Sequence, residues 1–330
     1  QEKRRHYFIR RLKEEMVDYH GQPIYKPRLC QTVKFGLSKP EQAFYEESSE
    51  YLRWSFETNK TLNRNAAAMV VAVLQRRLAS STYAMLQSLK RRRERIVNGA
   101  GPEPTASPER LLELLDTATA DESEPTETGT ESQERVEEQA LALSRPRGEK
   151  QQEMELRYLD ATIRQGEAIL EDQCETKFLK LREIVDSAEF QNERLLIFTE
   201  HRDTLEYLQQ RFEALGYTGQ VAAIHGGMDV EERERQRIFF MPPTERRRQN
   251  VPNPDGPSAR ILLATDAAGE GINLQFAWLM VNFDVPWNPA RLEQRMGRLH
   301  RFGQRHDEVR IFNFVAEKTR EGDVLATLLA

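Results

Sequence analysis

Short apolar runs alternate with amphipathic segments along the second half of the chain. The apolar runs are five to seven residues long and lie at 195–199, 221–225, 261–265, 279–283 and 309–315. Helices with one apolar face are expected between them, at 202–215, 229–241 and 289–298. Continuous apolar strands that are separated by helices are typical of a parallel sheet covered on both faces. The pattern therefore predicts a doubly wound α/β domain, whose ligands bind at the carboxyl ends of the strands.

The first half of the chain has a helical period instead. Residues 21–40 hold three prolines around the alternating sequence TVKFGL, which suggests a connecting strand. Apolar residues at three- and four-residue spacing predict long helices at 41–54 and 61–97, and helix resumes from about 151 to 186. The chain is thus expected to have three parts, a linker at 1–40, a helical insertion at 41–186 and the α/β domain at 187–330.

Residues 98–150 interrupt the helical insertion with a composition that disfavours folding. Pro, Thr, Ser and Glu dominate 101–135, which cannot bury enough apolar surface to offset the entropy of ordering. Residues 100–140 carry twelve acidic and two basic side chains, a net charge of −10 within a total of −5, so the other residues sum to +5. We expect 98–150 to be a largely disordered acidic loop, which raises the hypothesis that it occupies a basic groove as an autoinhibitor.

Basic residues are bunched at three places, Lys90-Arg91-Arg92-Arg93-Glu94-Arg95, Arg246-Arg247-Arg248 and 291–305. A bunched basic surface permits nucleic-acid binding. Solvated helix faces and loops explain the first two clusters equally well.

Cysteine content and hydropathy bound the class of protein. Cys30 and Cys174 have no CxxC spacing, which predicts free thiols in a reducing compartment and neither a zinc site nor a disulfide. No apolar run approaches the roughly 20 residues needed to span a bilayer. We therefore expect a cytoplasmic protein without a membrane partner.

Glycine-rich turns follow two of the predicted strands. The sequence DAAGEGINLQ follows 261–265, and its small residues let the backbone approach a phosphate or a ribose closely. Thr265 offers a hydroxyl at the same edge. The turn Gly226-Gly227 follows His225 and leads into a helix N-terminus, which favours anions. Both features also have a plain structural explanation, because βα turns need glycine and a lone histidine at a strand end is commonly structural.

The densest cluster of candidate chemistry lies at 284–304, which reads DVPWNPARLEQRMGRLHRFGQ. Arg298 and Arg301 are three residues apart, so on a helix they would project from one face. Planar, permanently charged guanidinium groups at this density fit a phosphate. Taken alone, a solvated basic helix explains the segment equally well.

Four segments together resemble motifs of the superfamily-two helicases. The segments RLLIFTEHRDTLEYL, HGGM, LLATDAAGEGINLQ and DVPWNP-EQRMGRLHRFGQ are similar to motifs IV, IVa, V and VI, in the order of that family. The QR-GR-HR-GQ form of the last resembles the Swi/Snf-type ATPases, particularly the bacterial branch near RapA and the phage-defence DISARM helicases. The resemblance covers nearly the whole chain outside 98–150. It implies that the α/β domain is a RecA-like C-terminal lobe and that 1–40 include the end of a first lobe.

The same resemblance implies roles for individual residues. Arg298 and Arg301 would face the γ-phosphate of a nucleotide as arginine fingers, with Gln294 helping to order the site. On the ribose side, the nucleotide would be bound by Gly269, Glu270, Gly271 and Asn273. Contacts with a nucleic-acid backbone would come from Thr199, Arg202, His225, Gly226, Gly227 and Thr265.

Two parts of such an ATPase are missing from this sequence. It has no GxxxxGK[ST] loop and no acidic DExx box before the arginine segment. By the resemblance, ATP and Mg²⁺ would be bound mainly by a first RecA-like lobe outside this sequence, and the chain alone would be inactive. Motif V departs from the common pattern, with Asp266 where eukaryotic members often carry Arg and Glu270 where they often carry Leu. This leaves RNA and single strands open beside duplex DNA as the substrate.

Two functions therefore remain in view. The first is the C-terminal lobe of an ATP-dependent DNA translocase or helicase, and the alternative is a non-catalytic RecA-like module that docks nucleic acid or protein. The presence of both Arg298 and Arg301 favours the enzyme. The expected partners are duplex DNA and the first lobe, with recognition of a protein such as RNA polymerase or a defence-complex subunit as a hypothesis for the helical insertion. A helical protrusion that only braces the fold explains the insertion equally well.

Overall fold

The computed structural model describes residues 15–60, 64–98, 139, 148–266, 274–319 and 322. Most of the acidic loop and the glycine-rich turn at 267–273 lie outside these residues, so what we expect of them stays a prediction.

Among the described residues, six strands form one sheet in which every neighbouring pair is parallel. The spatial order is β1-β6-β5-β2-β4-β3. The bounds are Arg28–Phe35 for β1, Leu195–Thr199 for β2, Val221–Ile224 for β3, Ile261–Thr265 for β4, Leu279–Asn282 for β5 and Val309–Ala316 for β6. Every residue of β2, β4 and β5 is buried, as expected of a sheet covered on both faces. The predicted doubly wound parallel sheet is confirmed.

The sheet begins earlier in the chain than the expected boundary at 187. Strand β1 lies in the stretch assigned to the linker, yet it pairs with β6 over its whole length, from Arg28 opposite Val309 to Phe35 opposite Ala316. Helix α8 (Thr176–Val185) was assigned to the insertion, but its buried residue Phe178 belongs to a hydrophobic core of the sheet. Local pattern could not show either contact, because β1 pairs with a strand more than 270 residues away and Phe178 packs on residues of another helix, such as Tyr207 and Phe212.

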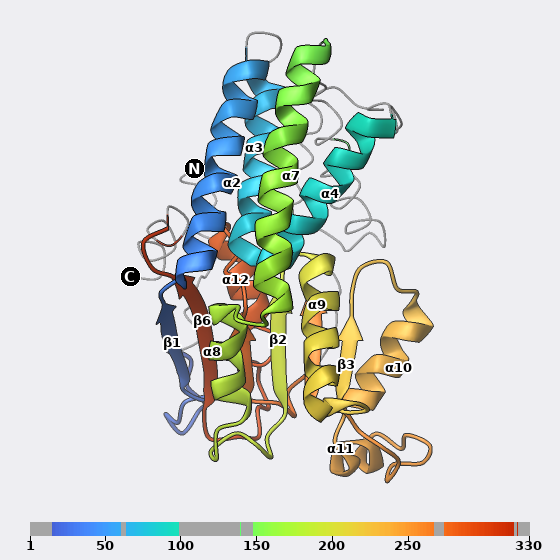
Figure 1. The fold of residues 1–330 in the computed structure, drawn as a ribbon. Helices are drawn as coiled ribbons and strands as arrows, with labels where there is room; N and C mark the ends of the chain where they lie inside the picture. The colour runs from blue at the N-terminus through green and yellow to red at the C-terminus, as the bar shows by residue number, and fades with distance from the viewer. Residues whose placement is uncertain are drawn as a thin grey trace, which may run out of the picture.

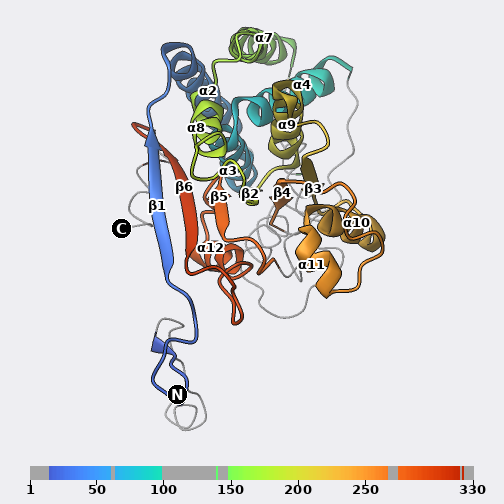
Figure 2. The ribbon, with the colours of Figure 1, turned by 90° about the horizontal axis from the view of Figure 1, so that it is seen from below.

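Helices cover both faces of the sheet, as Figure 2 shows. On one face lie α8 and α9 (Arg202–Phe212), and α9 continues as a π-helical turn, η2 (Glu213–Tyr217), around Gly216 with φ +92°. On the other face lie α10 (Val230–Phe240), α11 (Pro243–Arg248) and α12 (Pro289–Met296). The expected helices at 202–215, 229–241 and 289–298 are thus found, with the last ending two residues early.

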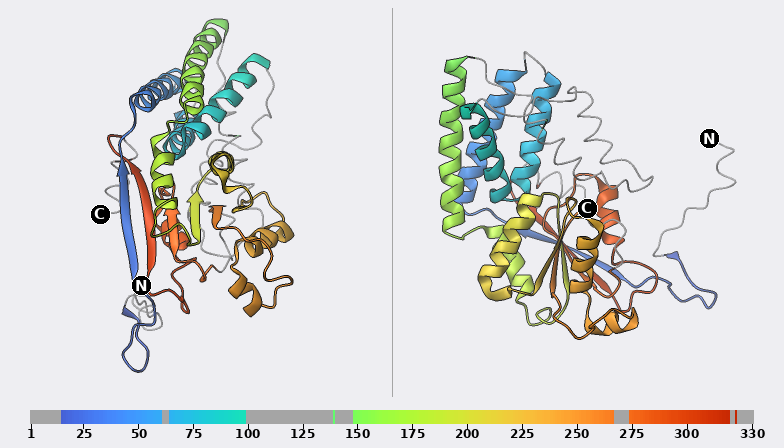
Figure 3. Two further views of the ribbon diagram at one scale, coloured as in Figure 1. Left: turned by 60° about the horizontal axis from the view of Figure 1, so that its bottom comes forward. Right: turned by 90° about the vertical axis from the view of Figure 1, so that its right-hand side faces the viewer.

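Four further helices form a bundle, α2 (Lys39–Asn59), α3 (Arg64–Ser80), α4 (Thr82–Asn98) and α7 (Glu149–Glu171). Figures 1 and 3 place this helical bundle beyond the carboxyl ends of the strands. Its core includes the fully buried side chains of Tyr51, Leu74 and Met85. None of the helices described here is long and apolar enough to cross a membrane.

The single helix expected at 61–97 is two helices that meet at a corner. The Ser81 hydroxyl accepts a hydrogen bond from the Ala84 backbone N–H at 3.0 Å, so Ser81 caps the start of α4. We call residues 79–82 the α3–α4 corner. The apolar spacing continues across the corner, which is why periodicity alone joined the two helices.

Two of the three basic clusters are used inside the fold. In α4, four successive basic residues pair with acidic residues of α7 and α9: Lys90 with Glu167, Arg91 with Asp203, Arg92 with Glu155 and Arg93 with Asp160. In α11, the buried Arg246 donates to the backbone carbonyls of Ile238, Phe239, Gly256 and Pro257. These contacts explain both clusters as structural features of the bundle and of the loop at 242–260.

Candidate functional site

Acidic residues gather where three neighbouring strands end, beneath the helical bundle. Strands β5, β2 and β4 lie side by side, and they are followed by Asp284, Glu200 and Asp266 respectively. Because parallel strands end at one edge of the sheet, these carboxylates lie close together. Arginines from α3 and α12 reach them from both sides. We call this arrangement the strand-end network.

Asp284 is the centre of the network. Its carboxylate accepts hydrogen bonds from the hydroxyls of Thr199 and Ser80, both at 2.6 Å, and from the backbone N–H of Glu200 at 2.7 Å. Thr199 is fully buried and its hydroxyl is used in this contact. The expected role of Thr199 in holding a nucleic acid is therefore not supported, because this side chain positions Asp284 instead.

Arg295 ties α12 to the strand ends. Its guanidinium makes a two-point ion pair with Asp266 and donates to the Asp284 carbonyl at 2.6 Å. It also reaches the Asn282 side-chain oxygen at 3.3 Å. Burial alone would lower the pKa of Arg295, but Asp266 and Asp284 outweigh that effect and raise it. An arginine that is 2% exposed and paired on every side is a structural clamp.

Arg298 and Arg301 do not share a helical face, which corrects the sequence-based expectation. Helix α12 ends at Met296, and Gly297 to Gly303 form a series of turns, which we call the arginine turn. Both arginines are half-buried, and Arg301 Nε donates to the Gly297 carbonyl at 2.7 Å. The guanidinium groups are thus presented by a turn at the end of a helix, and not by the helix itself.

Two buried polar residues of the same segment hold the arginine turn in place. Gln304 is buried and donates to the carbonyls of Ala277 and Leu299, both at 3.0 Å. The buried His300 contacts the Lys26 carbonyl through Nε2 at 2.9 Å. Sequence reasoning quoted these residues in the motif but gave them no role.

Described residues on either side of 267–273 are bonded to α12 and to the arginine turn. On one side, Asp266 pairs with Arg295. On the other side, the Gln275 side-chain amide donates to the Phe302 carbonyl at 2.6 Å. The four residues expected to bind a nucleotide, Gly269, Glu270, Gly271 and Asn273, lie between these two ties and outside the described residues. Gln294 is exposed on α12.

Four of the residues expected to contact a nucleic acid do come together at the end of β3. A Cβ built on Gly227 would lie 3.5 Å from His225 Nδ1 and 3.6 Å from Arg202 Nη1. Arg233 from α10 donates to the Gly226 carbonyl at 3.0 Å. Burial lowers the pKa of His225, with Arg202 and Arg233 acting in the same direction against Glu206. We call Arg202, His225, Gly226, Gly227 and Arg233 the β3-end cluster.

Thr265 differs from the β3-end cluster in its surroundings. It is 2% exposed, and its hydroxyl has no hydrogen-bond partner among the described residues. It therefore ends β4 inside the fold, where a nucleic acid could reach it only if its surroundings moved.

Sequence reasoning missed the residues that join the helical bundle to this edge. Arg76 of α3 pairs with Glu200 at 2.7 Å. Burial alone would raise the pKa of Glu200, but Arg76 outweighs it and lowers the pKa to about 2. Both Glu200 and Asp284 directly follow predicted strand runs, and the rule that selected Thr199 and Thr265 would have found them. No local signal marks Arg76, which lies within an ordinary helical pattern.

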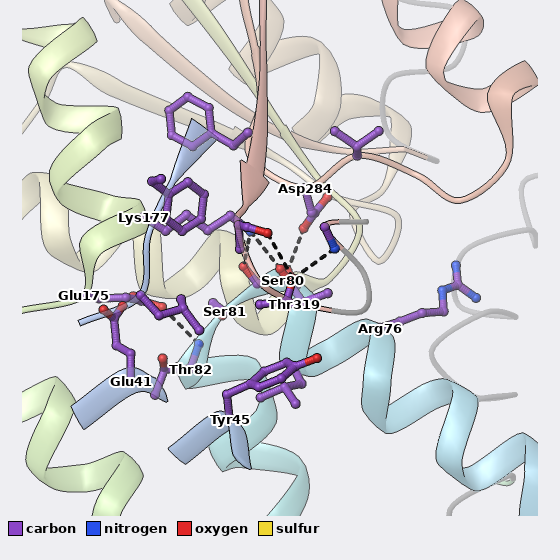
Figure 4. Close-up of a pocket in the computed structure, with 18 of the residues that line it drawn as sticks. Glu41, Tyr45, Arg76, Ser80, Ser81, Thr82, Glu175, Lys177, Asp284 and Thr319 are labelled. Carbon is purple, nitrogen blue, oxygen red and sulfur yellow. Dashed lines mark hydrogen bonds between the residues drawn. The ribbon is translucent and has the colours of Figure 1, made fainter. Parts of the chain in front are cut away.

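A cavity opens beside the strand-end network, between the bundle, α8 and the ends of β1 and β6 (Figure 4). Apolar side chains such as Phe35, Phe44 and Phe314 line it together with Lys177 and Asp284. Burial lowers the pKa of Lys177 to about 8, although Asp284 and Glu175 act in the opposite direction. The cavity lies on the bundle side of the network.

Comparison with known proteins agrees with the geometry. Residues 176–303 match the family model described as the helicase conserved C-terminal domain. The chain is 28% identical over 306 residues to an uncharacterized ATP-dependent helicase, YqhH, of Bacillus subtilis (strain 168), covering 92% of this chain and 40% of that protein. It is 37% identical over 119 residues to the RNA polymerase-associated protein RapA of Serratia proteamaculans (strain 568), covering 35% of this chain and 11% of that protein.

A solved structure shares the fold. The helicase domain of Pyrococcus furiosus Hef aligns with a TM-score of 0.50 and 17% sequence identity, over 93% of this chain and 59% of that one. The chain thus spans less than half the length of the two curated relatives that it matches here.

Proposed function

We propose that this chain is the C-terminal lobe of an ATP-dependent DNA translocase or helicase of superfamily two and supplies one half of its ATPase site, because residues 176–303 match the helicase conserved C-terminal domain. The other half, with the phosphate-binding loop, would come from a first RecA-like lobe. Arg298 and Arg301 would then act across the cleft between the two lobes.

The observation that carries this proposal is a pair of contacts on either side of residues 267–273, an ion pair of Asp266 and a hydrogen bond of Gln275. Arg295 holds the residue before this segment, and the arginine turn holds Gln275 shortly after it. The described residue before this segment is therefore held by α12, and a described residue after it is held by the arginine turn. This supports a common site for a nucleotide, with Gly269, Glu270, Gly271 and Asn273 on one side and the two arginines on the other.

The chemistry of phosphoryl transfer explains why a turn suits these arginines. Negative charge spreads over the γ-phosphoryl oxygens in the transition state, and an arginine supplied in place stabilises it. Mg²⁺ would neutralise charge between the β- and γ-phosphates from the side of the first lobe. Because the arginines approach only when the lobes close, hydrolysis becomes coupled to movement of the lobes.

The β3-end cluster supports a contact with the backbone of a nucleic acid. It combines the guanidinium groups of Arg202 and Arg233 with the glycines that follow β3, where the backbone can approach a phosphate closely. Such contacts position a strand without reading its sequence and weaken with salt. We therefore propose duplex DNA as the first substrate to test, with single-stranded DNA and RNA as the comparison.

The helical bundle offers the surface for a protein partner in this proposal. The printed name of one relative states that it is associated with RNA polymerase. RNA polymerase is therefore the first partner to test for binding to the complete protein.

The deciding experiment is Arg301→Ala in the complete protein, which includes the first lobe. DNA-stimulated ATP turnover should fall by about 10³- to 10⁵-fold, whereas binding of ATP should be nearly unchanged. Arg305→Ala is the matched control, because the exposed Arg305 lies four residues further on and pairs with Glu245 of α11. Turnover that survives Arg301→Ala would favour the alternative of a non-catalytic docking module.

A further inference from the structure

We propose that the α3–α4 corner positions the arginine turn, so that the helical bundle and the ATPase site respond to each other. This inference rests on the proposed function, since it assigns the bundle a part in ATP hydrolysis. Polar contacts link this part of the bundle to α12 by two separate routes, one from the corner through Ser80 and one from the preceding turns of α3 through Arg76.

Hydrogen bonds hold the corner against the carboxyl ends of the strands, and Figure 4 shows Ser80 between Lys177 and Asp284. Lys177 donates to the carbonyls of Ala79 and Ser80 at 2.8 and 2.7 Å. The Ser81 hydroxyl lies 2.8 Å from the hydroxyl of Thr204 in α9. These groups are all buried or nearly so, and such contacts have few alternatives in a low-dielectric interior.

The first route runs through Asp284. The Ser80 hydroxyl donates to the Asp284 carboxylate at 2.6 Å, and Arg295 donates to the Asp284 carbonyl at 2.6 Å. Arg295 lies in the last turn of α12, two residues before the arginine turn begins. A shift of the corner therefore acts on the residue that anchors the arginine turn.

The second route runs through Glu200. Arg76 of α3 pairs with Glu200 at 2.7 Å, and Glu200 lies 4.0 Å from Arg291 at the start of α12. Arg291 in turn lies 3.9 Å from Asp266. The two routes hold both ends of α12, so that a movement of α3 would turn or shift this helix as a unit.

The physical consequence is a positioning role for Ser80 and Arg76. Neither side chain is expected to touch the nucleotide. Each sets the place of a carboxylate, and the carboxylates set the place of α12. A partner that moves the bundle would change how well Arg298 and Arg301 reach the γ-phosphate, which alters the turnover rate more than ATP binding.

The test compares Ser80→Ala with Ser88→Ala in the complete protein. Both serines are fully buried, but the Ser88 hydroxyl donates only to the Ala84 carbonyl of its own helix. We expect Ser80→Ala to lower the kcat for ATP roughly 2- to 30-fold relative to Ser88→Ala, with equal KM for ATP and equal Tm. Equal kcat values for the two variants, while Arg301→Ala is inactive, would overturn this inference and leave the proposed function standing.

The route is tested by repeating Ser80→Ala in an Asp284→Asn background. If Ser80 acts through Asp284, the second change should lower kcat little further. An equal fold-decrease in both backgrounds would reject the route through Asp284. Should Asp284→Asn fail to fold, Arg76→Gln replaces it as a probe of the parallel route, and a kcat equal to that of the unchanged protein would overturn the role of α3.

Discussion

Two arginine-rich stretches of this chain look alike in sequence and have different surroundings in the structure. The run at 90–95 lies within α4, where each of its first four members meets an acidic residue of a neighbouring helix. The stretch at 295–301 begins with one clamped arginine and then leaves the helix at Gly297. Arginine density alone therefore does not distinguish a brace from a binding site. The distinguishing feature is the break in the helix close to the end of a strand.

The largest difference should appear in catalysis. Arg298→Ala in the complete protein should lower ATP turnover by about 10³-fold or more, because it removes a charge from the arginine turn. Arg93→Ala removes a charge from the α4 run, where the side chain is 42% exposed and paired with Asp160, and should leave turnover within about twofold. Steady-state ATPase assays with saturating DNA measure both. A comparable loss in Arg93→Ala would mean that the two stretches share a function.

The next largest difference should appear in stability. Arg92→Met should lower the free energy of unfolding by about 3–5 kcal/mol, because it leaves the buried carboxylate of Glu155 without its charged partner. Urea denaturation of the chain measures this change. The double variant with Glu155→Leu should regain most of the loss, and a double variant as unstable as the single one would contradict the explanation.

Acid should weaken the contact between the bundle and the sheet. The pKa of Glu200 is lowered to about 2 in the folded chain from an ordinary 4.5, so this carboxylate stabilises the fold above about pH 4.5 and loses that contribution as the pH falls toward 2. Between pH 6 and pH 2.5, the free energy of unfolding of the unchanged chain should fall by up to about 3 kcal/mol more than that of the Glu200→Gln variant. Parallel curves for the two proteins would exclude Glu200 as the source.

The smallest difference should appear in the salt dependence of DNA binding. Arg202→Gln in the β3-end cluster should weaken binding equally for all sequences and reduce the slope of log K against log salt by about 1. Arg91→Gln in the α4 run should leave the slope unchanged, because Arg91 pairs with Asp203 within the contact between α4 and α9, whereas Arg202 pairs with Glu206 of its own helix. Fluorescence anisotropy titrations at several salt concentrations decide this. A reduced slope in Arg91→Gln would show that the run in α4 also faces DNA.

The sequence was sufficient for the parts of the fold that depend on local pattern. Five strands were located to within one residue at either end, because a buried parallel strand is a continuous apolar run. Four of the five residues of the β3-end cluster were also named from the sequence, since His225 and the two glycines lie at the end of such a run, but Arg233 was not. The sequence marked Arg298 and Arg301 but did not predict that they lie in a turn after α12. Long-range contacts of Gln304 and His300 hold this turn, and local pattern does not reveal them.

Long-range partners account for what local pattern could not supply. The break between helices α3 and α4 is held by bonds from Ser81 to Thr204 and from Ser80 to Asp284, partners that lie more than a hundred residues further along the chain. Strand β1 similarly has an exposed, mixed pattern that gives no sign of its pairing with β6. Charge clusters were the least informative signal, because ion pairs between helices of the bundle cannot be read from one helix at a time.

The pairing of β1 with β6 has a mechanical consequence. The two strands are parallel neighbours aligned over eight residues, so the start of β1 and the end of β6 lie at opposite ends of the strands. A pulling force between residues just before Arg28 and residues just after Ala316 would load the whole ladder of hydrogen bonds in shear, and not one bond after another. A tether of this geometry transmits tension without peeling, and it would let motion of whatever precedes β1 draw directly on the sheet.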